Sequence, residues 1–163
     1  MNNTSEKDVV LTYLDGLIAV QKFLDIYFFE TYSGDTASFL GDIQIRSDWG
    51  TMDPAAWEDW LDAINAIVGN PVNEPGIVHP MIEHGGKTFT SLQAYNSMRK
   101  FVGAYADRIS STELPSFLKE LEITEIGEVR NPTWWKRWVK SVNETLQDEQ
   151  IHFMHLFKKH LEK

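Results

Sequence analysis

A group of residues near the C-terminus has the composition of a metal site. Glu149 and His152 form a Glu-x-x-His pair, and His155 follows three residues later. On a helix the Glu-x-x-His spacing turns both of its side chains to one face, as in the di-metal sites of helical bundles. His84 is a fourth candidate ligand. The pattern would suit a metal-dependent hydrolase or transferase, so a helical enzyme that uses His152 and His155 is one hypothesis for the function.

A bundle metal site also needs inward-facing acids from other helices. The available acids, Glu30 and Asp107, do not occupy matching positions, and His152 and His155 stand beside Ile151 as polar surface positions would. We therefore predict no metal and no cofactor, and we predict that the protein is not an enzyme.

Other catalytic motifs fail on spacing or composition. Gly86-Lys87-Thr88 resembles the end of a phosphate-binding loop, but that motif requires glycine five positions earlier, where Met81 stands. The chain has no cysteine, which removes thiolate nucleophiles, disulfides and cysteine-bound zinc, and favours a cytoplasmic protein.

Charge is unevenly distributed along the 163 residues. Residues 1–78 hold thirteen acidic and three basic residues, a net charge of −10, whereas residues 79–163 hold eleven acidic and twelve basic residues, a net charge of +1. An acidic surface repels nucleic acid and membrane phosphates and attracts basic proteins. The plainest interpretation of this charge is a soluble surface, and a basic protein partner is the alternative; the charge argues against nucleic acid or a membrane.

An internal repeat predicts the fold. A shift of 78 positions aligns residues 11–67 with residues 89–145 without a gap, and Trp57/Trp135 and Trp60/Trp138 are among the identical pairs. Helical spacing of apolar residues and helix-capping residues predict three helices in each segment. We expect an all-α single domain over residues 1–163: two tandem three-helix repeats related by a pseudo-twofold axis, a linker at 68–88, and a C-terminal helix at 146–162.

Cap residues predict where these helices begin. Thr12 and Thr90, with Asp15 and Gln93 three residues later, fit the capping-box pattern. Asp35 is expected to cap the second helix of the first segment. Asp-Pro at 53–54 and Asn-Pro at 131–132 predict the starts of the third helices.

The third helices carry opposite charges at matching positions. The pairs Glu58/Lys136, Asp59/Arg137 and Asp62/Lys140 all reverse, and so does Glu30/Arg108 on the first helices. These charges could pair within the chain, pair between copies in a homodimer, or form a docking surface for a basic partner. Trp49 adds to the last hypothesis, because it lies in an acidic loop where the second segment has Gly127.

Two strings resemble a known family: residues 39–44 (FLGDIQ) and 53–61 (DPAAWEDWL). They look like small acidic immunity proteins of bacterial contact-dependent and other polymorphic toxin systems. The resemblance implies a cytosolic antidote that binds one toxin domain, commonly a basic nuclease, and blocks its active site. The second segment departs from the acidic string, with Lys136-Arg137 in the matching place.

The function we expect is therefore a protein-binding module, an immunity protein that neutralises a cognate toxin domain through an acidic surface. The predicted binding residues are Asp42, Asp48, Trp49, Glu58, Asp59 and Asp62. The third hypothesis is a self-associating structural protein. A homodimer is expected under this hypothesis, and also if the reversed charges pair between copies.

Overall fold

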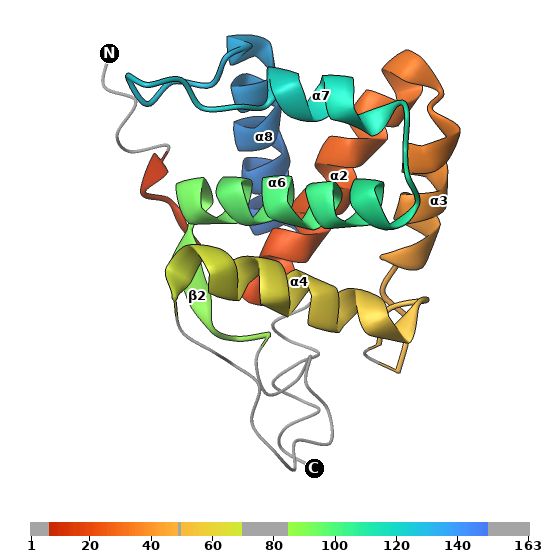
Figure 1. Cartoon of the computed structure of the whole chain (residues 1–163). Coiled ribbons are helices and arrows are strands. Elements are labelled where there is room, and N and C mark those ends of the chain that lie inside the picture. The colour runs from red at the N-terminus through yellow and green to blue at the C-terminus, as the bar shows by residue number, and fades with distance from the viewer. Residues whose placement is uncertain (1–6, 49, 70–84, 150–163) are drawn as a thin grey trace.

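The computed structural model describes residues 7–48, 50–69 and 85–149, and within them the chain forms six α-helices. In chain order the elements are β1 (Val10–Thr12), α2 (Tyr13–Thr31), α3 (Gly34–Asp42), α4 (Pro54–Val68), β2 (Thr88–Thr90), α6 (Ser91–Arg108), α7 (Leu114–Glu120), α8 (Pro132–Glu144) and a short π-helix (Thr145–Glu149). Figure 1 shows α6 lying across the bundle between α4 and α7. The fold is mostly helical, as the sequence predicts.

The helices begin at the predicted caps. The Thr12 and Thr90 hydroxyls accept hydrogen bonds from the N–H groups three residues on, and the Gln93 side chain completes the capping box by accepting from the N–H of Thr90. Asp53 and Asn131 each cap a helix whose first residue is proline. Each cap satisfies a backbone N–H that lacks a partner inside the helix.

The prediction that Asp35 caps α3 is wrong. Ser33 is the cap, because its hydroxyl accepts from the N–H of Thr36 at 3.2 Å. Asp35 instead accepts a 2.6 Å hydrogen bond from the hydroxyl of Ser111. Ser33 in turn donates to Glu113 at 2.9 Å. The α2–α3 and α6–α7 junctions are thus joined by two reciprocal hydrogen bonds.

A two-stranded antiparallel sheet was not expected in an all-α fold. β1 and β2 pair Val10 with Thr90, Leu11 with Phe89, and Thr12 with Thr88. Each strand is the extended segment that leads into a helix cap, so its backbone groups are free to pair. The sheet joins the two segments rather than lying within one of them, and its central residues Leu11 and Phe89 are buried.

The two segments pack against each other through their first and third helices. α4 packs chiefly against α6, and α2 packs chiefly against α8, so the first helix of each segment meets the third helix of the other. Tyr27 stacks on Phe117 at 3.8 Å between ring centroids, and Phe39 stacks on Tyr105 at 4.3 Å. The core therefore lies between the segments.

Trp60 and Trp138 are fully buried, and their indole N–H groups donate to the carbonyls of Tyr13 and Ser91. Trp57 is buried too, but its counterpart Trp135 is only partly buried. Trp135 lines a hollow of about 220 Å³ together with residues of the turn at 123–129. This hollow leaves part of the indole uncovered. The matching residues Trp57 and Trp135 therefore differ in burial.

The predicted boundaries need small changes where they can be compared. α4 extends to Val68, and β2 begins at Thr88, so both ends of the predicted linker belong to regular elements. Most of the linker and of the predicted C-terminal helix lie outside the described residues.

Candidate protein-binding surface

The predicted binding acids begin at the turn that joins α3 to α4. The backbone N–H of Asp53 donates to the carbonyl of Asp42 at 2.9 Å, and the N–H of Arg46 donates to the carbonyl of Gly50 at 2.7 Å. A bridge between residues 45 and 51 holds the two arms together. The turn is therefore a narrow, hydrogen-bonded hairpin that holds Asp48 at its tip.

Asp48 faces solvent, and its side chain is 59% exposed. One of its carboxylate oxygens pairs with Arg46 at 2.8 Å, and the other accepts from the N–H of Gly50 at 3.3 Å. Asp42 is half-buried at the end of α3. Trp49, the aromatic residue predicted to anchor a partner, lies outside the described residues.

The acids of α4 fall into two groups. Glu58 and Asp62 are exposed and four residues apart, so they are neighbours on the helix surface. Asp62 also borders a hollow between α4 and α6 that Lys100 and Arg108 line. Within the part of the chain that the structure describes, neither Glu58 nor Asp62 makes an ion pair. Asp59 is half-buried and pairs with Arg108 of α6 at 3.0 Å. The structure therefore leaves Glu58 and Asp62 open to a partner and engages Asp59 internally.

The four residues of two reversed pairs, Glu30/Arg108 and Asp59/Arg137, form ion pairs with one another within the chain. Asp59 of α4 pairs with Arg108 of α6, and Glu30 of α2 pairs with Arg137 of α8 at 2.6 Å. Residues 30 and 108 are matching positions, and so are residues 59 and 137, so the two pairs are counterparts with their signs exchanged. The reversed charges were expected to pair within the chain, to pair between copies or to form a docking surface. For these four residues, pairing within the chain is observed.

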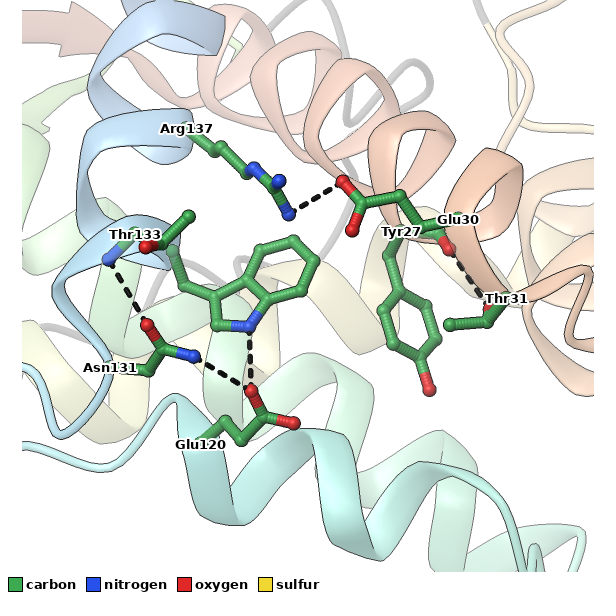
Figure 2. A network of polar contacts seen from close by, with 8 residues as sticks. Tyr27, Glu30, Thr31, Glu120, Asn131, Thr133 and Arg137 are labelled. Atoms are coloured by element: carbon green, nitrogen blue, oxygen red, sulfur yellow. Dashed lines mark hydrogen bonds and ion pairs between the residues drawn. The ribbon is translucent and has the colours of Figure 1, made fainter.

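A network around Trp134 fixes the second of these ion pairs (Figure 2). Arg137 lies over the indole ring of Trp134, with its guanidinium carbon 4.6 Å from the ring centroid. The indole N–H donates to Glu120 at 3.0 Å, and the side-chain amide of Asn131 donates to the same oxygen at 2.9 Å. The arginine is thus held by stacking on one side and by Glu30 on the other.

No family model, no curated protein and no solved structure matches this chain. The arguments for its function therefore come from the surface itself.

The hypothesis of a metal site can be compared with the described residues only. They contain no group of three or more histidine, cysteine, aspartate or glutamate residues placed to hold a metal ion. The candidate ligands His84, His152 and His155 lie outside the described residues, so the structure does not test them. None of the described helices is long and apolar enough to cross a membrane.

Sequence reasoning missed an exposed aromatic cluster at the end of α2. Phe29 is 67% exposed and Tyr32 is 73% exposed, and Phe28 lies between them with its ring centroid 5.7 Å from each of theirs. The alignment of the two segments could have indicated this cluster, because the matching residues at 106, 107 and 110 are alanine, aspartate and serine. An aromatic residue that the matching position does not require is a candidate for surface function.

One buried acid stands apart from this surface. Asp15 in the first turn of α2 is 1% exposed, and its Oδ2 atom is buried without a hydrogen-bond partner. Burial raises the pKa of Asp15 from 3.8 to about 6, and the hydrogen bond with Thr12 opposes this rise only in part. Burial also raises the pKa of Tyr95, whose hydroxyl donates to the carbonyl of Leu121.

Proposed function

We propose that this protein is a binding module for a basic protein, and that it acts as an immunity protein that neutralises a cognate toxin domain in the cytoplasm. The observation that carries the proposal is the pair Glu58 and Asp62. Both are exposed on one face of α4, and neither makes an ion pair within the described residues. Asp48, at the tip of the turn that leads into α4, is a third exposed carboxylate and pairs with Arg46. These three residues are called the acidic face below.

The physical basis is electrostatic steering. Fixed charges of one sign raise the encounter rate with an oppositely charged protein and orient its approach, and salt screens this effect. The acidic face belongs to the first 78 residues, which carry a net charge of −10, and the matching face of α8 carries Lys136 and Lys140. A basic partner would therefore be drawn to α4 and repelled from α8.

We also propose that residues 11–67 and 89–145 are tandem copies of one unit. Support comes from contacts that recur with an offset of 78 residues. The hydrogen bonds of Trp60 and Trp138 both reach a backbone carbonyl 47 residues earlier in the chain. The bridge between residues 45 and 51 likewise has a counterpart between residues 123 and 129.

The test is a comparison of two charge-matched double variants. Glu58→Lys with Asp62→Lys installs the residues of the second segment, so we expect the fold to tolerate it. Glu125→Lys with Glu128→Lys changes the net charge equally at exposed positions of another loop. The ligand is the protein encoded next to this chain, once it has been shown to co-purify with it.

We expect the α4 variant to slow association by about tenfold or more at low salt and to weaken its salt dependence, while the control variant has a smaller effect. Trp49→Ala should instead speed dissociation by about 30-fold, as the loss of an anchor residue does. Equal rates for the parent and the α4 variant would show that the interface lies elsewhere.

A further inference from the structure

The exposed aromatic cluster on α2 has no role in the acidic face. Phe28, Phe29 and Tyr32 form this cluster, called the aromatic knob below, at the end of α3 opposite the turn that carries Asp48. Tyr32 sits at a left-handed backbone position (φ 53°), where a bulky side chain is disfavoured. Large exposed aromatic residues without a packing role mark protein contacts.

The second segment has a hollow where the first has the knob. Between α6 and α7 lies an open trough of about 770 Å³, lined in part by Gly103, Ala106, Ser110 and Leu118. Gly103, Ala106 and Ser110 are the counterparts of Asp25, Phe28 and Tyr32. The trough is open because small residues replace large ones on α6.

The knob and the trough lie at the same end of the molecule. Tyr32 directly precedes Ser33, and Ser33 donates to Glu113 at the start of α7. Ser111, which lines the trough, donates to Asp35 at the start of α3. These reciprocal bonds hold the two junctions side by side, so a second molecule that meets this end can reach both features.

We propose that two copies of this chain associate through this end, with the aromatic knob of each copy seated in the trough of the other. A twofold axis closes such an assembly, because each copy supplies one knob and one trough. Charge gives limited support to the pairing: Asp25 lies one helical turn before Phe29 and is exposed, whereas the trough is lined by Arg99 and Lys119 together with Asp107 and Glu122. Glu122 forms an ion pair with Arg130, which leaves the two cations and Asp107 to face a second copy. The occupant of the trough is thus a second copy, through an end that leaves the acidic face free.

The experiment measures the mass of the full chain in solution by sedimentation equilibrium over about a hundredfold range of concentration. We expect a concentration-dependent dimer of the 18.8 kDa chain. Phe29→Asp with Tyr32→Ser installs the residues of the second segment and should weaken the dimer by about 30-fold or more. Gly103→Asp should also weaken it, and a side chain fits there because its Cβ would meet only Leu118 Cδ1 at 4.0 Å.

Two controls separate this interface from general stickiness. Ile126→Asp removes a side chain that is 81% exposed and lies on another loop, and it also installs the residue of the matching position. This variant should dimerise like the parent. Circular dichroism and a urea melt of every variant show whether it remains folded.

A mixture of the knob variant and the Gly103→Asp variant gives the sharpest result. One partner keeps its trough and the other keeps its knob, so the mixed dimer regains one of two contacts and should be heavier on average than either variant alone. A monomeric parent chain would overturn the proposal. A dimer that Gly103→Asp leaves intact would show that the trough is not involved. Neither result bears on binding to a basic partner, which Glu58 and Asp62 test separately.

Discussion

Replacement of Asp15 by asparagine tests whether burial of one carboxylate lowers the stability of the protein at neutral pH. Asp15 Oδ2 is buried and accepts no hydrogen bond, whereas the matching Gln93 accepts one from the N–H of Thr90. A buried ionised group without a partner disfavours the folded state, and protonation relieves that cost. Asparagine is neutral and nearly the same size as aspartate, so Asp15→Asn removes the charge and little else.

The pKa of Asp15 in the folded protein sets the magnitude. Its rise from 3.8 to about 6 corresponds to about 3 kcal/mol in the free energy of unfolding, because a shift of one pKa unit corresponds to about 1.4 kcal/mol. The folded state binds the proton more tightly than the unfolded state, so this contribution to stability is complete below pH 3.8 and is lost as the pH rises through about 6. Wild type should therefore be penalised strongly at pH 7.5 and only slightly at pH 4.

The assay is urea unfolding of both proteins from pH 4 to pH 7.5, followed by tryptophan fluorescence. The free energy of unfolding of Asp15→Asn minus that of wild type should rise by about 2.5 kcal/mol across this range, because part of the effect is already present at pH 4. A constant offset from the amide itself cancels, because only the pH dependence of the difference is used. A difference that stays flat with pH would refute the reasoning and would mean that Asp15 finds a partner or solvent in the folded protein.

Three further results are expected. Trp60→Ala should lower the free energy of unfolding by about 3–5 kcal/mol in urea melts, because it empties a fully buried site and orphans a carbonyl. Glu30→Arg should cost about 1 kcal/mol or less by bringing two cations together at a partly exposed site, and Arg137→Glu in the same chain should restore the loss. Elemental analysis should find no stoichiometric zinc, iron or manganese; metal that disappears when His152 and His155 are changed would contradict this.

The starts of the helices could be predicted from the sequence because caps act locally. Thr12, Asp53 and Asn131 each cap within three residues of themselves, so their spacing in the sequence contains the geometry. Asp35 could not be assigned in this way. Ser33 competes for the same helix end, and the choice depends on Ser111, which is distant in sequence and draws the Asp35 carboxylate away.

The pairing of the helices could not be predicted, because the repeat pattern fits packing within a segment as well as between segments. The same limit applies to the candidate surface. The sequence indicates that Glu58, Asp59 and Asp62 all face outward, but only the position of α6 shows that Asp59 meets Arg108. The aromatic knob was missed because Phe28 fits the apolar spacing of a core helix, and the end of the core along α2 depends on where α3 begins.

The reciprocal ion pairs explain why the charges are reversed between the segments. Residue 30 faces residue 137 and residue 108 faces residue 59, so the pairing is always between one segment and the other. Two first segments in the same arrangement would bring Glu30 against Asp59, and two second segments would bring Arg108 against Arg137. Like charges at such partly exposed contacts would be unfavourable by about 1 kcal/mol or less each, whereas opposite charges attract. The reversal therefore favours contact between the two different segments, and Glu58 and Asp62, which lie outside these ion pairs, carry the same reversal.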